Sequence, residues 1–303
     1  MSLIAYNKPP LSLQDQARLL ISRGLQGITE SELVQVLSNI SYYRLRGYTY
    51  PYQNNAVPGS PFLTGVCWAY IKNDYEFDAG LRTIVSEALS YIEIAVRTQM
   101  EYHLSLSHGS RWYEDSALCN SQNIFRDNLD ELRKHWNRSR EVFKEHYLNK
   151  YDSSVSPPAW MIFETTTFGT VSKTFSNLKN NIPAKTAVAQ YFGFSRNTMR
   201  VLVSWFQHLN LVRNICAHYS RLFTRSFIVR PMIPTHRPTK WVDSIPRQDR
   251  IYFSLCIITK LLDSCAPNYQ FKEKLKELMK KVRRDQLPSL GFPENWREQD
   301  LFT

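Results

Sequence analysis

The chain has 303 residues, of which 43% are hydrophobic and 13% aromatic, and its formal net charge is +11. This composition is too apolar and too aromatic for a disordered protein, and the length allows a large core in one or two domains. With 10 glycines, and neither G-x-G-x-x-G nor G-x-x-x-x-G-K-[ST], the chain lacks the loops that hold nucleotide phosphates. Rossmann and P-loop folds are therefore not expected.

The apolar segments and the cysteines of the chain indicate its cellular location. MSLIAYNKPP at the start contains no long apolar run, and no stretch approaches the ~20 apolar residues of a membrane-spanning helix. We expect a cytoplasmic protein with no signal peptide and no membrane partner. The five cysteines form no C-x-x-C pair and are expected to be buried thiols: Cys67, Cys119, Cys216, Cys256 and Cys265.

The positive charge is concentrated in the last third of the chain. Residues 196–303 hold 19 Lys and Arg against 9 Asp and Glu, whereas residues 1–195 hold 19 against 18. A concentrated basic region attracts polyanions, above all nucleic acid. A merely solvated surface is the alternative, so the charge nominates RNA as a partner without establishing it.

The first 60 residues are predicted to form an N-terminal helical region, and residues 61–303 a larger helical domain. Ser12 can cap a first helix that continues to residue 25, and the pair Thr29 and Glu32 forms a capping box for a second helix. Residues 41–52, SYYRLRGYTYPY, follow. Their candidates for contacting RNA are Tyr43, Arg44 and Arg46, and packing beneath a neighbouring helix is the alternative.

The remaining segments also show helical periodicity. Apolar residues recur every three or four positions over 70–106, which predicts one long helix. Glu93 and Arg97 lie four residues apart on it, so they share a face and can pair; an ordinary ion pair is the alternative. Further helices are predicted over 111–151, from residue 160, and over 197–220, 250–265 and 272–284, with breaks at 156–158 and 230–241. The fold class is therefore all-α.

The segment LVRNICAHYSRLFTR, residues 211–225, carries the best candidates for chemistry. Asn214, His218, Arg221 and Arg225 are spaced i, i+4, i+7 and i+11, which predicts one polar, basic face at the end of an apolar-striped helix. Arg221 and Arg225 on this face are candidates for binding RNA. A histidine can move a proton to or from an RNA hydroxyl near neutral pH. The guanidinium of Arg213 can hold a phosphate through a two-pronged contact. Asn214 can bind the phosphate or orient the histidine ring.

No other enzyme template fits. The chain contains no H-E-x-x-H, no G-x-S-x-G and no dense acidic cluster, so no metal and no cofactor are expected. An arginine separated from a histidine by four to six residues occurs at four places, and spacing alone does not choose among them. The four pairs are Arg97/His103, Arg140/His146, Arg213/His218 and Arg230/His236. Asn214 and the basic face favour Arg213/His218, and Arg97/His103 is its competitor. A solvated helix end with an incidental histidine is the remaining alternative.

RNICAHYSRLF resembles the R-N-x-x-A-H-x-x-R signature of the Abi-like (AbiD/AbiF) abortive-infection proteins of bacteria. Five other stretches are similar to the same family in the same order, at residues 7–25, 40–52, 75–98, 165–178 and 291–296. The family is thought to belong to the HEPN superfamily of helical proteins with an R-x(4–6)-H motif. The resemblance therefore implies a HEPN-like helical bundle with an N-terminal helical extension.

The resemblance also implies function. In that superfamily two copies of the motif commonly meet across a homodimer and form one metal-independent RNase site. Carried onto this chain, Arg213 and His218 would be the catalytic pair, with Asn214 between them and Glu93 and Arg97 lining the site from the long helix. It further implies phage defence by abortive infection, with RNA as substrate and a small structured RNA as a further partner.

Three alternatives stay open from the sequence. An RNA-binding module that sequesters RNA, or is held by a structured RNA, would use the same basic face and tyrosines. A chemically similar site could transfer nucleotides, although no Gly-rich or acidic motif supports this. A protein–protein scaffold would show no salt-sensitive RNA binding.

Overall fold

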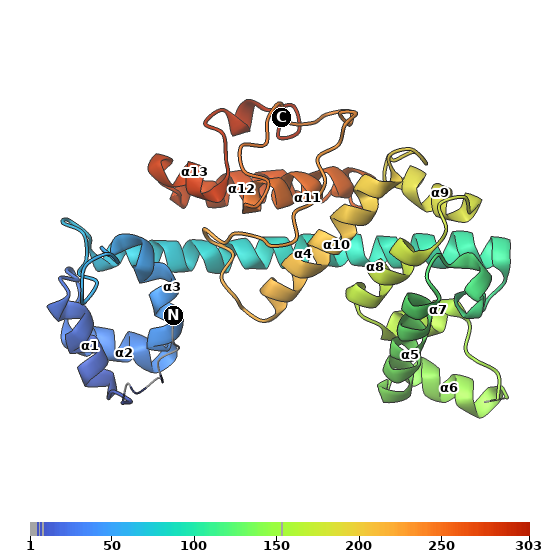
Figure 1. Ribbon diagram of the computed structural model, residues 1–303, viewed down its shortest axis with the longest axis horizontal. Helices are drawn as coiled ribbons and strands as arrows, with labels where there is room; N and C mark the ends of the chain where they lie inside the picture. Colours follow the sequence, from blue (N-terminus) through green and yellow to red (C-terminus); the bar gives the residue numbers. More distant parts are fainter. Residues whose placement is uncertain (1–4, 6, 8, 153) are drawn as a thin grey trace. The chain divides into compact units, whose positions relative to one another are not determined.

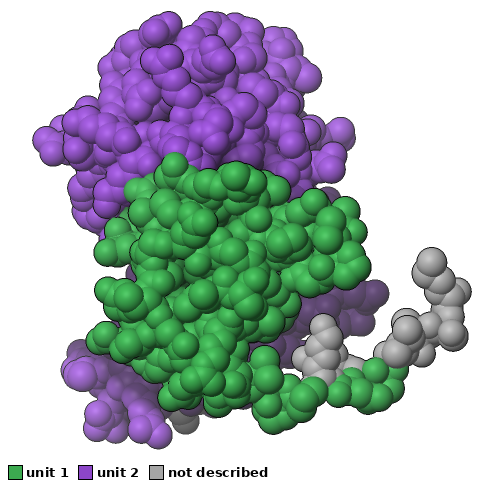
Figure 2. Space-filling model, turned by 90° about the vertical axis from the view of Figure 1, so that its left-hand side faces the viewer, with its two compact units in different colours: residues 1–80 green, residues 81–303 purple. Residues whose placement is uncertain are grey.

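A computed structural model gives the fold of this chain (Figure 1) and describes residues 5, 7, 9–152 and 154–303. Over those residues the chain is helical and contains no strand, only isolated β-bridges, which confirms the all-α prediction. Figure 2 distinguishes its two compact units, Met1–Gly80 and Leu81–Thr303. Their boundary lies inside the long helix and not at residue 60.

The first unit extends past residue 60 because the chain returns to its N-terminal helices. The backbone N–H of Phe62 donates to the carbonyl of Arg23 at 2.7 Å, and that of Trp68 donates to Gln26 at 2.8 Å. The Tyr52 hydroxyl then donates to Asp74 on the long helix at 2.6 Å. The helices of this unit are α1 (Leu13–Ser22), α2 (Glu30–Asn39), α3 (Tyr42–Thr49) and the first turns of α4 (Trp68–His108).

Both helix caps predicted in the first unit are present. The Ser12 side chain accepts the backbone N–H of Asp15 at 3.1 Å, and Thr29 and Glu32 form the reciprocal capping box. The first helix ends at Ser22, earlier than predicted, because the chain turns at Gly24 with a φ of +98°. Residues 41–52 form the helix α3 and a 3-10 turn.

The second unit packs shorter helices around the remainder of α4. Figure 1 shows α10 crossing α4, and the core of this unit contains Trp205, Phe206 and Trp296. The region 111–151, predicted as helical, contains two α-helices. The helix predicted from residue 160 is interrupted by a 3-10 turn, after which α8 begins. The helix α9 was not predicted. The elements are α5 (Gln122–Arg138), α6 (Val142–Lys150), α7 (Ala159–Ile162), α8 (Phe168–Asn177), α9 (Pro183–Tyr191), α10 (Met199–Ala217), α11 (Ile251–Cys265), α12 (Phe271–Leu278) and α13 (Leu287–Leu290).

His208 is a buried histidine of α10 that joins three segments. Its Nδ1 lies 2.7 Å from the carbonyl oxygen of Val229, and its Nε2 lies 2.7 Å from the hydroxyl of Ser254 on α11. Because a carbonyl only accepts, Nδ1 carries the proton and the Ser254 hydroxyl donates to Nε2. Burial lowers the pKa of His208 to about 4. The ring is therefore neutral and structural at neutral pH.

This low pKa predicts a loss of stability in mild acid. Below its ordinary pKa of 6.5 the unfolded chain binds a proton at His208 that the folded chain does not, so stability falls as the pH drops from about 6.5 towards 4. The full effect is on the order of 3 kcal/mol. Urea unfolding at pH 7 and pH 5 should show a smaller loss for His208→Gln than for the wild type. An equal loss in both proteins would contradict this assignment.

Gly291, which follows α13, is predicted to tolerate no side chain. Its φ is +84°, and a Cβ there would lie 2.7 Å from the Cβ of Arg250 and 3.3 Å from that of Arg247. We expect Gly291→Ala to lower the free energy of unfolding by about 2–4 kcal/mol, through left-handed strain and this clash. Gly109→Ala is the matched control, because Gly109 has a φ of +83° and nothing within 4 Å. Equal losses for the two variants would rule out the clash.

Candidate functional site

The predicted motif lies at the C-terminal end of α10. The backbone N–H of Tyr219 donates to Cys216 at 2.9 Å and that of Ser220 donates to Ile215 at 2.9 Å, which is a Schellman ending with His218 as the C-cap. Tyr219 has a φ of 53°, a left-handed conformation that costs a bulky residue about 1–2 kcal/mol. The helix therefore ends at Ala217, and His218 is exposed at its tip.

This ending corrects the predicted basic face. Arg221 and Arg225 lie beyond the helix, so they do not continue the row of Asn214 and His218. Within the loop, Arg225 donates to the carbonyl of Arg221 at 3.2 Å, and Arg221 donates to the hydroxyl of Thr224 at 3.1 Å. The four residues would share a face only on an uninterrupted helix, whereas here the backbone N–H groups of residues 219 and 220 bond to the carbonyls of the last turn and end it.

Arg213 is anchored from α4. Its Nε lies 3.6 Å from Glu93 Oε2, and 39% of the Arg213 side chain remains exposed. Asn214 is exposed on the same helix. No hydrogen bond or ion pair joins Arg213 to Asn214 or His218 in the described part of the chain. The structure thus brings Glu93 and Arg213 together and leaves part of the Arg213 side chain exposed to solvent.

Arg97 is the buried centre of the neighbouring charge cluster. Its side chain is 9% exposed, and its Nη atoms lie 3.3 Å from Glu93 and 3.2 Å from Glu164. It also donates to the carbonyl of Thr166 at 3.3 Å. The sequence indicated Glu93 and Arg97 as a pair on one helix face, but no sequence signal pointed to Glu164 and Thr166. The fold brings them in from the 3-10 turn before α8.

Glu101 continues the polar face of α4, four residues after Arg97. Burial raises its pKa to about 8, with a further increase from the charge of Glu164 and a partial decrease from Arg97. One of its carboxyl oxygens is buried without a hydrogen-bond partner among the described residues, as are Arg97 Nε and the hydroxyl of Thr166. Glu101 therefore retains a proton at neutral pH. It adds no third negative charge beside Arg97, whose charged partners are Glu93 and Glu164.

Arginines also gather around Asp249, near the loop that follows α10. Arg247 and then Ser226 hydrogen-bond to the Asp249 carboxylate and hold its pKa well below the ordinary range. Arg250 donates to the carbonyl of Thr224. Burial lowers the pKa of Arg250, the charges of Arg247 and Arg221 lower it further, and the charge of Asp249 partly offsets this. Arg247 and Arg250 share the Asp249 carboxylate, at 3.0 and 3.8 Å.

The other predicted RNA contacts lie on α3 in the first unit. The Tyr43 side chain is 87% exposed, and Arg44 is exposed beside it. The guanidinium of Arg46 lies over the ring of Tyr50, 5.7 Å from its centroid. Packing beneath a neighbouring helix, the alternative for these aromatics, applies to Tyr48, which is 1% exposed, and not to Tyr43.

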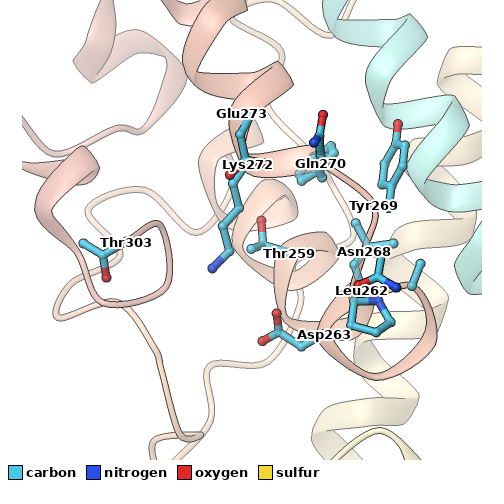
Figure 3. Close-up of a pocket in the computed structure, with 12 residues that line it drawn as sticks. Thr259, Leu262, Asp263, Asn268, Tyr269, Gln270, Lys272, Glu273 and Thr303 are labelled. Carbon is cyan, nitrogen blue, oxygen red and sulfur yellow. The ribbon is translucent and has the colours of Figure 1, made fainter.

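One cavity of the second unit, of about 350 Å³ between α11 and α12, is lined by none of the predicted site residues (Figure 3). Asp263, Tyr269 and Lys272 contribute to the walls, together with Thr303 at the chain end. Among the described residues, no group of three or more His, Cys, Asp or Glu side chains is placed to hold a metal ion. In the same part of the chain, no helix is long and apolar enough to span a membrane.

These features define an all-α protein in which a partly exposed Arg lies in the last turn of one helix, an exposed His caps it, and a buried charge cluster on a second helix contacts the Arg. Residues 35–224 match the family described as Abi-like protein, and the chain belongs to this family. The match includes α3, the charge cluster and the motif at the end of α10. No curated protein and no solved structure matches the chain significantly.

Proposed function

We propose that this protein is a metal-independent endoribonuclease of the HEPN type that acts in the cytoplasm, in abortive-infection defence against phage. His218 is the general acid/base, Arg213 stabilises the phosphate, and Asn214 positions the substrate or the histidine ring. The observation that carries the proposal is the contrast between the two arginines at Glu93. Arg97 is enclosed, whereas Arg213 is held by the same carboxylate and still exposed.

The same contrast favours the pair Arg213/His218 over the pair Arg97/His103. Arg97 pairs with two carboxylates and a backbone carbonyl, so it has little capacity left for a phosphate in the pair Arg97/His103. Arg213 has one carboxylate partner at 3.6 Å. Glu93 and Arg97 thus act as positioning residues for Arg213.

The chemistry follows from the side chains. A histidine that removes the proton of the 2′-hydroxyl starts attack on the adjacent phosphorus, and the O5′–P bond then breaks as the 5′-oxygen receives a proton. Arginine stays charged throughout and binds the phosphate as its charge increases. The products are a 2′,3′-cyclic phosphate and a 5′-hydroxyl.

The proposal includes a homodimer, in which two motifs form one site. Three apolar side chains on one face of α4 are unusually exposed, Ile94 at 57%, Tyr102 at 59% and Leu106 at 72%. Exposed apolar surface of this kind marks interaction sites, and we expect the second copy there. A monomer in sedimentation analysis at the concentration used for cleavage would contradict this part.

An RNA-binding protein that sequesters RNA, or is held by a structured RNA, is the second candidate. It is supported by the positive charge of residues 196–303 and by the two arginines that share the Asp249 carboxylate. The two candidates differ in the effect of one substitution in cells. We expect the expressed protein to be toxic to its host cell, as abortive infection requires. His218→Ala should abolish this toxicity if the protein cleaves RNA, and should leave it unchanged if the protein only binds RNA.

Product analysis tests the proposed chemistry. Labelled RNA is incubated with the protein in EDTA, and the new ends are identified by their phosphorylation state. A 2′,3′-cyclic phosphate and a 5′-hydroxyl are expected. A 3′-hydroxyl with a 5′-phosphate would contradict the proposal, because those ends come from water attacking the phosphate.

A further inference from the structure

The first unit contains a cavity of about 720 Å³ beside α3. Its apolar walls come from Pro10 and the leucines of α1 and α2, including Leu19 and Leu37. Tyr43 and Arg46 line it, and so does Arg23 at the end of α1. Ligand sites fall in this size range and combine apolar walls with a few polar groups. Arg44, although exposed, is not among the lining residues.

The charged side chains described at this cavity are all positive. Among the described residues that line it, Arg23 and Arg46 are the cations and none is acidic. The second cavity of the same unit differs, because Glu32 and Glu76 line it together with Lys72. Two guanidinium groups without a facing carboxylate favour an anionic ligand.

Arg23 is placed to act on such a ligand. Its Nη1 donates to the Tyr42 hydroxyl at 2.8 Å, which fixes the guanidinium against the start of α3. Its Nε is buried and has no hydrogen-bond partner among the described residues. Leaving a buried donor of a charged group unpaired costs free energy, so the hydrogen bonding of this guanidinium is incomplete among the described residues.

The aromatic component narrows the ligand class. Tyr43 is 87% exposed and lines the cavity together with leucine and proline side chains. A base that is not stacked in a duplex can pack against such a ring while its phosphates meet the arginines. Paired bases within a helix present no free face to it.

We propose that this groove, lined by Arg23, Tyr43 and Arg46, binds unpaired nucleotides of RNA. The inference deepens the proposed function, because it names the form of RNA that the N-terminal unit recognises. Tyr43 stacks on a base, and Arg23 and Arg46 contact the flanking phosphates.

Binding is tested on the full chain carrying His218→Ala, so that cleavage does not interfere. Fluorescence anisotropy is measured with a short single-stranded RNA and with a duplex of the same sequence. Tyr43→Ala should weaken single-strand binding about tenfold. Arg46→Gln should reduce the salt dependence of log K by about 0.7, the value for one lost phosphate contact. Duplex binding should change little in either variant.

Arg18→Gln is the matched control. Arg18 lies on α1 outside the groove and pairs with Asp15 and Glu30, so the variant removes the same charge from the same unit. Wild-type affinity in Tyr43→Ala and Arg46→Gln, or an equal loss in Arg18→Gln, would overturn the proposal. Release of the RNA by hexaglutamate at the same concentration as the RNA would also overturn the proposal, because the site would then recognise negative charge alone.

The outcome is separable from that of the proposed function. Binding that depends on Tyr43 and Arg46 in a protein that never cleaves RNA would establish the groove and refute the nuclease. Cleavage by the wild type together with unaltered binding in both variants would establish the nuclease and refute the groove.

Discussion

Replacing His218 by alanine is expected to lower the rate of RNA cleavage by about 10²–10⁴-fold, the usual contribution of a general acid/base. RNA affinity should be nearly unchanged, because the basic groups around Asp249 and in the first unit remain. The rate is measured with labelled RNA in EDTA under single-turnover conditions. Affinity is measured in parallel by anisotropy.

His146→Ala is the matched control for this variant. His146 is an exposed histidine on α6, and it also follows an arginine at the spacing of the motif. Its replacement should leave the rate within a factor of two or so of wild type, as for most surface substitutions. A wild-type rate in His218→Ala would remove His218 from the mechanism. In that case His103 is the next residue to replace.

Replacing Glu101 by glutamine should stabilise the protein at neutral and alkaline pH. The folded pKa of about 8 lies above the ordinary value of 4.5, so the folded chain holds a proton that the unfolded chain loses between these pH values. The stability of the wild type therefore falls as the pH rises from about 4.5 to 8. Glutamine has the same shape and no charge. The gain should reach on the order of 2–3 kcal/mol near pH 8 and vanish near pH 4.5.

Urea unfolding at pH 5 and pH 8 measures this difference. Glu145→Gln, an exposed change on α6, serves as the control and should show no comparable gain. A Glu101→Gln protein that is less stable than the wild type at pH 8 would show that Glu101 is ionised and paired in the folded state. The charge balance around Arg97 would then need a different account.

Local sequence patterns predicted the parts of this fold that depend on neighbouring residues. The capping groups of Ser12 and Thr29 and the long apolar repeat of α4 are set within a few residues, and all three were predicted. The last turn of α10 was not, because the left-handed Tyr219 stands where glycine usually ends a helix. Periodicity alone gives no sign of that stop.

Contacts between segments distant in the sequence limit how much of the candidate site could be predicted. Glu93, Arg97 and Arg213 were all named from the sequence, and the structure places them in one cluster. Glu164 was not named, because only the path of the chain before α8 brings it to Arg97. Arg23 was missed for the same reason, since its place beside Tyr42 depends on how α1 meets α3.

In the proposed reaction, Arg213 and His218 cleave RNA without a metal ion. The most direct test incubates labelled total RNA in EDTA with the wild-type protein and, side by side, with the Arg213→Ala/His218→Ala variant. Cleavage by the wild type alone is expected. Equal cleavage by both proteins, or tight binding with no cleavage by either, would contradict it.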